Sequence, residues 1–597
     1  MTYRAPIADI LFAMTHEAGL DLGLKDGIYS DLGDGFAEAT LTEAGKFAGN
    51  VLAPLNRAGD KAGATFEAGM VKTAPGFAEA YRAWTAGGWN AITGPSEYGG
   101  TALPVLLNTA CIEIWSAANM AFSLCPLLTL AAIDAVQSHA SESLKAVYLA
   151  KLISGEWSGT MNLTEPQAGS DLGALKTRAE RQQDGTYKLF GSKIFITYGE
   201  HDMTENIVHF VLARLPDAPK GTRGISLFLV PKFLAGADGA LGARNDVHCV
   251  SLEHKLGIHA SPTCTMVYGD HGGAIGFLVG EENKGLACMF TMMNSARLNV
   301  GVQGVAIAER AFQQALAYAK ERRQGHALGG KGDVMSPIVQ HPGVARMLMT
   351  MKALRAAARA ICFMTAESID RSHREKDISA RDVAGQRASL LTPVAKAFST
   401  DIGNEVASLG IQVHGGMGYI EETGAAQFLR DARIASIYEG TNGIQEIDLV
   451  QRKLGLSGGA TVHREIVAMR AAVEALRNSN SEAFGEMESC LTEAVDALDR
   501  ATAFMLDAVT TRAGDALAGA TPYLRLFAIA LGGTALARGA LAAQRLSQAG
   551  NGDSTLPAQI ATARFFAENI ATGASGLERE ATRGADSVHA GAAALLQ

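Results

Sequence analysis

One glutamate stands in a setting that suits proton transfer. Glu439 lies in the segment IYEGTNGIQ (437–445), among apolar and small residues, just before a predicted helix. A carboxylate in such surroundings is poorly solvated, and the loss of water raises its pKa toward the range of a general base. The position also suits an acid that pairs with the positive end of a helix. The segment alone leaves both interpretations open.

Two further segments are rich in small residues that let a ligand approach the backbone. LTEPQAGSD (163–171) combines glycine, proline and a hydroxyl where a helical pattern gives way to strands, and QVHGGMGY (412–419) has three glycines in four positions. Both suit contact between backbone N–H groups and a polar ligand or a phosphate. Each also suits a structural role, the first as a turn and the second as the glycine stop of a helix.

The spacing of apolar residues, which indicates the helices and strands that hold these segments, changes twice along the chain. Apolar residues recur at helical spacing from about 41 to 153, at strand spacing from about 158 to 279, and at helical spacing again from 284. The segment LGLSGGAT (454–461) predicts a linker. We therefore predict an α+β, mainly α fold with five parts: an N-terminal arm (1–40), an N-terminal helical domain (41–157), a middle β-domain (158–283), a helical bundle with Glu439 (284–455) and a C-terminal helical domain (456–597).

The charge balance argues against nucleic acid as a partner. Lys and Arg number 52 and Asp and Glu number 61, so the net charge is −9. Residues 455–597 hold 11 Arg, no Lys and 15 acids, a balance of −4. A net negative domain is repelled by a phosphate backbone.

Secretion and membrane insertion are also disfavoured. The first residues are interrupted by charges and do not form a secretory signal. Residues 114–133 contain no charge and are long enough for a membrane span, but Pro126 in mid-run favours a pair of buried core helices. Seven widely spaced cysteines without a C-x-x-C pair suit free thiols in a reducing compartment. We predict a cytoplasmic protein without a membrane span.

Taken together, the three segments resemble the signatures of the acyl-CoA dehydrogenases, a flavoprotein family, in their order and their helix–sheet–helix setting. Further matches are GPSEYGG (94–100), KLGIHASPTC (255–264), GFLVGEENKGL (276–286) and ERRQ (321–324). The resemblance runs from about residue 40 to 455. The additional ends resemble a longer subgroup with an N-terminal arm and a C-terminal helical domain, to which 3-methylmercaptopropionyl-CoA dehydrogenases belong.

This resemblance implies an FAD cofactor, no metal, and Glu439 as the catalytic base. Some relatives place the base immediately before the position of Arg297, but Ala296 stands there and cannot accept a proton. The resemblance also implies two sets of contact residues. The FAD contacts are Met161, Leu163, Thr164, Ser170, Phe195, Ile196, Thr197, Arg322, Gln324, His341, Gln412, Gly415, Gly416 and Thr441, and the substrate contacts are Ser170, Asn294, Arg297 and Gly440.

The implied reaction is α,β-dehydrogenation of an acyl-CoA thioester to the trans-2-enoyl-CoA. The subgroup points to 3-methylmercaptopropionyl-CoA as the substrate and methylthioacryloyl-CoA as the product. A short- or medium-chain fatty acyl-CoA is the alternative substrate, and an acyl-CoA oxidase or a DNA-associated flavoprotein of the same fold are alternative functions. The expected partners are an electron-transferring flavoprotein as electron acceptor and a second copy of the chain in a homodimer.

Overall fold

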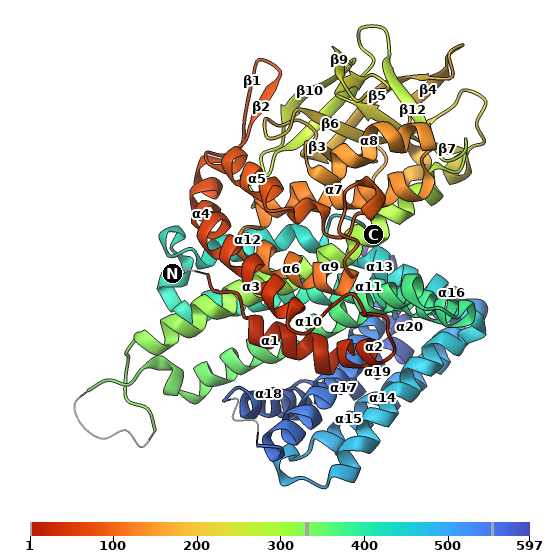
Figure 1. The fold of residues 1–597 in the computed structure, drawn as a ribbon. Helices are drawn as coiled ribbons and strands as arrows, with labels where there is room; N and C mark the ends of the chain where they lie inside the picture. The colour runs from red at the N-terminus through yellow and green to blue at the C-terminus, as the bar shows by residue number, and fades with distance from the viewer. Residues whose placement is uncertain (1–2, 329–333, 551–553, 597) are drawn as a thin grey trace.

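The N-terminal part of the chain is an arm followed by a helical domain (Figure 1). The computed structural model describes residues 3–328, 334–550 and 554–596. A hairpin of β1 (Thr65–Glu67) and β2 (Met70–Lys72) interrupts the helical pattern, which the sequence did not predict because each strand has only three residues. The helices are α1 (Ile7–Phe12), α2 (Leu20–Lys25), α3 (Phe36–Phe47), α4 (Ala53–Ala62), α5 (Phe77–Ala86), α6 (Val105–Ala118), α7 (Met120–His139) and α8 (Glu142–Ser154).

The uncharged stretch 114–133 folds as a pair of buried helices, as predicted, but the break lies at Asn119 and not at Pro126. Asn119 separates α6 from α7, and its side chain caps α7 by accepting a hydrogen bond from the N–H of Phe122 at 3.1 Å. Pro126 lies inside α7. By length and hydropathy α7 is one of two described helices that would suit a membrane span, together with a C-terminal helix (520–548), and both are mostly buried within the protein.

The middle β-domain is an eight-stranded, mainly antiparallel sheet at one end of the molecule (Figure 1). Its strand order is β10-β11-β5-β12-β7-β6-β3, with β4 beside β5, and β3 runs parallel to β6. Helix α7 packs against β3, so the sheet rests on the N-terminal helices. The strands are β3 (Trp157–Asn162), β4 (Arg178–Arg181), β5 (Tyr187–Thr197), β6 (Asn206–Arg214), β7 (Ile225–Pro231), β10 (Val247–Leu252), β11 (Thr263–Tyr268) and β12 (Ala274–Val279), with β8 (Phe233–Ala235) and β9 (Leu241–Arg244) forming a separate ribbon.

Three long helices form the bundle at the centre of the molecule. They are α9 (Gly285–Glu321), α10 (Pro342–Arg374) and α11 (Ile378–His414), and α9 packs on both of the others. A buried ion-pair network joins them to α6: the Arg359 guanidinium donates to Glu113 and to Glu309. After α11 follow α12 (Ala425–Ala432) and α13 (Asn442–Asp448).

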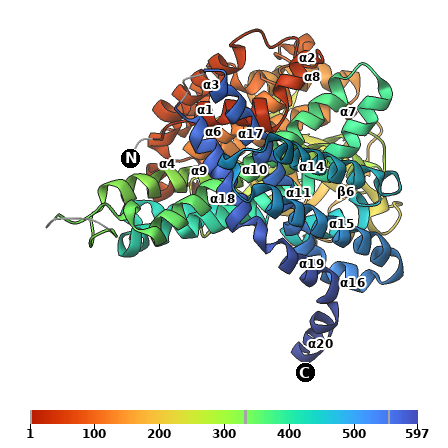
Figure 2. The same cartoon turned by 90° about the horizontal axis from the view of Figure 1, so that it is seen from below.

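The C-terminal domain packs directly on the bundle, with α17 against α10 and α11 (Figure 2). The predicted linker is a compact turn, because a 3-10 turn occupies Leu456–Gly459 and a helix begins at Ala460. The predicted order of helix, sheet, helix and helix is confirmed. The domain contains α14 (Ala460–Ser479), α15 (Met487–Thr511), α16 (Ala513–Ala518), α17 (Ala520–Gln548), α18 (Leu556–Asn569), α19 (Ala574–Arg583) and α20 (Ala585–Leu595).

Candidate active site

Glu439 lies in a tight loop between a 3-10 turn (Arg433–Ser436) and α13. Its backbone has a φ of +55°, and the following Gly440 has a φ of +83°. A left-handed conformation at a residue with a Cβ costs about 1–3 kcal/mol and is concentrated at functional sites. Thr441 then caps α13, because its hydroxyl accepts from the N–H of Ile444 at 3.3 Å. The loop therefore holds the carboxylate just outside the start of a helix.

Burial raises the pKa of the Glu439 carboxyl above its ordinary value, and the charges of Arg297 and Lys396 oppose that rise. Arg297 comes from α9 and is itself buried, with its Nη1 3.7 Å from the carboxylate of Asp448. The net effect on Glu439 is a raised pKa, which makes the carboxylate a stronger base than one in water.

Buried polar atoms without a partner gather around this loop. They include Arg297 Nε, Gln303 Nε2 and Gln445 Oε1. Gln303 accepts a hydrogen bond from the Tyr438 hydroxyl through its other amide atom, and Gln445 donates weakly to the Glu439 carbonyl at 3.4 Å. Unsatisfied buried polar atoms are rare and need an explanation, so their concentration here suits a site that takes a polar ligand.

The loop 163–171 is fixed to the sheet by a buried ion pair that the sequence did not reveal. Lys193 of β5 has no exposed side-chain surface, and its Nζ lies 2.8 Å from Glu165 Oε1 and 3.0 Å from the Leu163 carbonyl. Glu165 also accepts from the N–H groups of Lys176 and Thr177 and from the Thr177 hydroxyl. These contacts hold the first glycine-rich segment in one conformation.

Phe195 presents its ring to the surface from the end of β5. The pairing of β5 with β11 shifts between Cys264 and Met266, and Phe195 in this irregularity has a φ of +61°. A bulge re-aims a side chain and is common beside active sites. The ring is 58% exposed, whereas the next residue, Ile196, is buried in the sheet core.

Models of known families match successive parts of the chain. The acyl-CoA dehydrogenase N-terminal, middle and C-terminal domain models match residues 37–156, 160–271 and 283–454. A model described as acetyl-CoA dehydrogenase C-terminal like matches residues 464–591. The chain belongs to the acyl-CoA dehydrogenase family. It is therefore an FAD-dependent oxidoreductase that dehydrogenates acyl-CoA.

Characterised relatives span nearly its whole length. A 3-methylmercaptopropionyl-CoA dehydrogenase of Ruegeria pomeroyi is 48% identical over 570 residues, which is 96% of each chain. A butyryl-CoA dehydrogenase of Syntrophomonas wolfei is 33% identical over 600 residues, again covering 96% of each chain. Both relatives therefore share the arm and the C-terminal domain as well as the central part.

Solved structures share the fold. The acyl-CoA dehydrogenase of Bacillus anthracis, complexed with FAD, has a TM-score of 0.72 at 20% identity and covers 94% of this chain and 90% of its own. A chain from the study of the electron transferring flavoprotein of Acidaminococcus fermentans has a TM-score of 0.58 at 27% identity, covering 70% of this chain and 97% of its own.

The described residues of this acyl-CoA dehydrogenase fit a flavin near the sheet. The exposed Phe195 ring offers a flat surface for stacking. Thr164 and Ser170 lie on the anchored loop, and within the described chain no backbone carbonyl accepts from the Ser170 N–H. Met161 and Ile196 have buried side chains and lie in strands β3 and β5. The predicted residues of this end are Met161, Leu163, Thr164, Ser170, Phe195, Ile196 and Thr197.

A second group of predicted FAD contacts lies at the far end of the bundle. Arg322 ends α9 and donates to Gln324 Oε1 at 3.1 Å, and His341 lies 2.8 Å from the Gln324 carbonyl. Gln412, Gly415 and Gly416 end α11, where His414 stacks on Tyr318 of α9 at 4.5 Å. Added Cβ atoms on Gly415 and Gly416 would meet nothing within 4 Å, so both backbones are accessible.

The second group lies far from Glu439 in the same chain. Arg297 beside Glu439 and Arg322 are 25 residues apart along α9, which at the helical rise is about 37 Å. Of the predicted substrate contacts, Arg297 and Gly440 flank Glu439, whereas Asn294 and Ser170 are exposed.

A cluster of possible metal ligands lies elsewhere, near the edge of the β-domain. The ligand atoms of Asp246, His248 and His271 lie within 4.8 Å of one another, and none of these residues is a predicted contact.

Lys396 is a site residue that sequence reasoning missed. It lies on α11 with no exposed surface, and its Nζ donates to Asn442 Oδ1 at 2.9 Å, three residues after Glu439. Asn442 in turn donates to Asp401 Oδ1 at 2.7 Å. Burial lowers the pKa of the Lys396 ammonium to about 7. The charged groups that face it are Glu439, Asp401, Arg297 and Glu446.

We expect Lys396→Met to shift the acidic limb of the pH profile of flavin reduction to higher pH. The Lys396 charge lowers the pKa of Glu439, so its removal leaves the carboxyl protonated up to a higher pH. Anaerobic stopped-flow rates of flavin reduction, measured across a range of pH, give the position of the acidic limb. Lys453→Met, which removes a lysine bound to Ser389, is the control. If the acidic limb of Lys396→Met coincides with that of the parent, the Lys396 charge does not influence Glu439.

Proposed function

We propose that Glu439 removes the α-proton of the acyl-CoA substrate. The single observation that carries this role is its position: a desolvated carboxylate on a strained loop, flanked by two cations and by buried polar atoms without partners. The chemistry that FAD supplies when bound is acceptance of the substrate's β-hydrogen together with its electron pair. Glu439 is left protonated, and the double bond forms between the α- and β-carbons.

The loop also offers a donor to the thioester carbonyl. Within the described chain, no backbone carbonyl accepts from the N–H of Glu439. A fixed N–H stabilises the negative charge that grows on the carbonyl oxygen as the α-proton leaves. Gly440 supports this approach, because its φ of +83° strains any residue with a Cβ and a Cβ there would lie 2.8 Å from Gln445 Nε2. We propose that Arg297 of α9, which lies beside Glu439, contacts the bound substrate.

We propose 3-methylmercaptopropionyl-CoA as the substrate and methylthioacryloyl-CoA as the product. Support comes from the Ruegeria pomeroyi relative of that name, which is 48% identical over 96% of both chains. A short-chain fatty acyl-CoA is the second candidate, because a full-length relative at 33% identity is a butyryl-CoA dehydrogenase. The two candidates are similar in size, since a thioether sulfur is close to a methylene.

An acyl-CoA panel separates the substrates. We expect kcat/KM to be highest for 3-methylmercaptopropionyl-CoA, with overlapping activity on butyryl- and valeryl-CoA, because one methylene of misfit is worth only about 1–3 kcal/mol. Reduction of the bound flavin under anaerobic conditions measures each substrate. An optimum at octanoyl-CoA or longer contradicts the proposed substrate and leaves the family unchanged.

We propose an electron-transferring flavoprotein as the electron acceptor and the cytoplasm as the location. The likeness to a chain from the Acidaminococcus fermentans study supports this acceptor. The seven cysteines are free thiols, which suits a reducing compartment. Acceptor-dependent turnover tests the partner, whereas rapid turnover with O₂ and release of peroxide would indicate an acyl-CoA oxidase instead.

We propose that the protein is a homodimer in which each FAD lies between two chains. The second group of contacts is about 37 Å from Arg297 in the same chain, so a partner's copy of that group is needed near each Glu439. We expect sedimentation of a species of twice 62.5 kDa. Arg322→Ala is expected to lose FAD, and Arg323→Ala, whose guanidinium donates to the Met335 carbonyl, is the control. A monomer that retains FAD contradicts the proposal.

A further inference from the structure

A cavity of about 900 Å³ lies outside the site described above. The N-terminal arm, α10, α11, α14 and α17 line it, so it marks the junction of the arm, the bundle and the C-terminal domain. One wall is built from alanines of α14, including Ala468, Ala471 and Ala475, whose small side chains leave the space open. The size and apolar wall are typical of a site for a small organic molecule.

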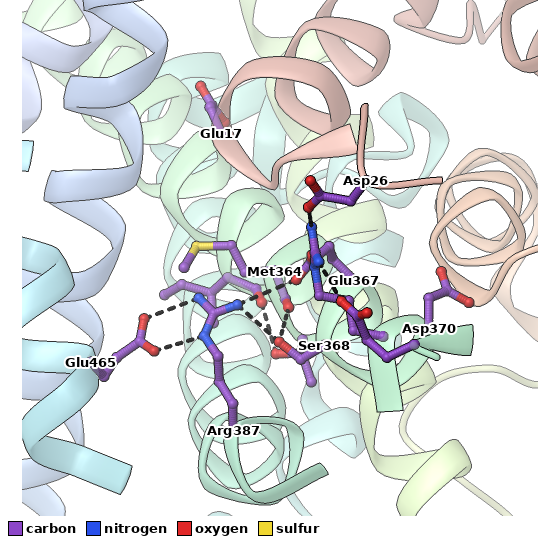
Figure 3. A network of polar contacts seen from close by, with 12 residues as sticks. Glu17, Asp26, Met364, Glu367, Ser368, Asp370, Arg387 and Glu465 are labelled. Atoms are coloured by element: carbon purple, nitrogen blue, oxygen red, sulfur yellow. Dashed lines mark hydrogen bonds and ion pairs between the residues drawn. The ribbon is translucent and has the colours of Figure 1, made fainter. Parts of the chain in front are cut away.

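Most charged groups around the cavity are matched to one another. Arg387 of α11 spans it, with its Nε 2.7 Å from Glu465 of α14 and its Nη1 2.9 Å from the Ser368 hydroxyl of α10 (Figure 3). Glu367 is bound by Arg371 and by Arg387. These contacts make a rigid floor and leave no unmatched charge among these residues.

Two acids at the rim are bound to the backbone instead. Asp21 Oδ1 accepts from the N–H of Leu22 at 2.9 Å, and Asp377 Oδ2 accepts from the N–H of Ala380 at 2.8 Å as the cap of α11. Both carboxylates therefore have a structural role.

Two arginines of α17 provide cations without an ion pair at contact distance among the described residues, although Glu465, Glu17 and Glu367 act on Arg538 electrostatically from farther away. Arg538 and Arg545 are seven residues apart, so they lie on one face of the helix. Arg538 donates to the Glu17 carbonyl at 2.7 Å and to Met364 Sδ at 3.3 Å, and no carboxylate of the described chain lies within ion-pair distance of it. Arg545 has no hydrogen bond or ion pair with the described residues, and His16 is its electrostatic neighbour.

Glu17 is a further polar group of the cavity. Its side chain is 5% exposed, yet its carboxyl accepts no hydrogen bond from the described residues. In Figure 3 it lies apart from the Arg387 network without a drawn contact. Burial raises its pKa to about 8, so near neutrality it is a neutral acid whose O–H donates a hydrogen bond. Its carboxyl lines the cavity and can therefore donate to an acceptor atom of a ligand.

We propose that this cavity binds an amphipathic organic anion, with a carboxylate or phosphate head at Arg538, Arg545 and Glu17 and an alkyl body along the alanines of α14. The planar guanidinium groups match the oxygens of either head. The alkyl body removes apolar surface from water at the α14 wall. The site is independent of the dehydrogenation, because none of its lining residues belongs to the proposed active site.

Isothermal titration of the holoenzyme with decanoate and with decyl phosphate tests the site. We expect one or both anions to bind at least tenfold more tightly than decanol and decyltrimethylammonium, and the tighter of the two identifies the head. Ala471→Trp fills the cavity from its wall and is expected to weaken binding at least tenfold. Val467→Trp, on the same helix but outside the lining and 65% exposed, is expected to bind like the parent.

A second variant keeps the test decisive if Ala471→Trp does not fold. Arg545→Gln removes an exposed cation and is expected to weaken anion binding at least threefold, whereas Arg583→Gln, on α19, leaves it unchanged. Equal binding of the anions, the alcohol and the cation overturns the proposal. Anion binding that survives both Ala471→Trp and Arg545→Gln also overturns it, because the anion is then bound elsewhere, such as at the active site.

Discussion

Replacement of Glu439 with glutamine is expected to slow flavin reduction by about 10³-fold or more, while FAD and substrate still bind. Glutamine keeps the size and polarity of the side chain but cannot accept the α-proton, and positioned bases contribute about 10²–10⁴-fold. A loss of 10³ corresponds to about 4 kcal/mol of barrier. Anaerobic stopped-flow spectroscopy of the bound flavin after mixing with acyl-CoA measures this rate.

Glu446→Gln provides the matched control for this experiment. Glu446 is the next acid along the chain and also has a raised pKa because of burial, but its carboxylate accepts from the Thr521 hydroxyl of α17. We expect this variant to reduce its flavin at close to the parental rate. Near-parental reduction in Glu439→Gln would assign the proton transfer to another group.

Replacement of Lys193 with methionine is expected to lower the free energy of unfolding by about 3–5 kcal/mol. The substitution leaves the buried Glu165 carboxylate without its cation, and an uncompensated buried charge has a penalty of this size. Denaturant titration of the protein measures the loss. Lys188→Met removes a lysine of the same strand for which no ion pair is found among the described residues, and is expected to change stability little.

Restoring the balance of charge at this pair supplies a second measurement. The double variant Glu165→Gln with Lys193→Met removes both charges, so we expect it to recover part of the stability that Lys193→Met loses. FAD retention is expected to follow the same order, because the pair fixes the loop 163–171 to β5. A double variant that is less stable than Lys193→Met would contradict the assignment of the loss to an unpaired charge.

The same pair predicts an acid dependence of stability. Burial alone would raise the pKa of Glu165, but the Lys193 charge and the hydrogen bonds to it lower the value from 4.5 to about 2. A carboxyl whose pKa is lower in the folded state stabilises the fold above the unfolded value and loses that contribution as pH falls. Unfolding between pH 5 and about 2 is therefore expected to be less pH-dependent in Glu165→Gln than in the parent.

The sequence predicted what depends on local pattern. The order of helices and strands follows from residue type and spacing within short windows, whereas Glu439 and the two glycine-rich segments were open to two interpretations and received their roles from the family resemblance. The structure places Glu439, in the loop before α13, beside Arg297 of α9, 142 positions earlier in the chain. That pairing was accessible from the family resemblance and not from periodicity.

What the sequence did not predict depends on contacts between distant residues. Lys396 and Asn442 are 46 positions apart, and Lys193 and Glu165 are 28 apart, so nothing in either neighbourhood marks a buried lysine. Both lysines lie in segments whose apolar pattern indicates a buried core. Lysine is rarely buried, so in such a segment its side chain would be expected to extend to the surface. The cavity at α17 likewise arises only when the arm meets the C-terminal domain.

The length of α9 has a genetic consequence. Because this single helix separates Arg297 from Arg322 by about 37 Å, the proposed dimer assembles each catalytic centre from two different gene copies. A copy that encodes Glu439→Gln and a copy that encodes Arg322→Ala are each inactive alone. In a mixed dimer, one centre receives both defects and the other receives neither, so a cell that expresses both copies regains dehydrogenation by complementation.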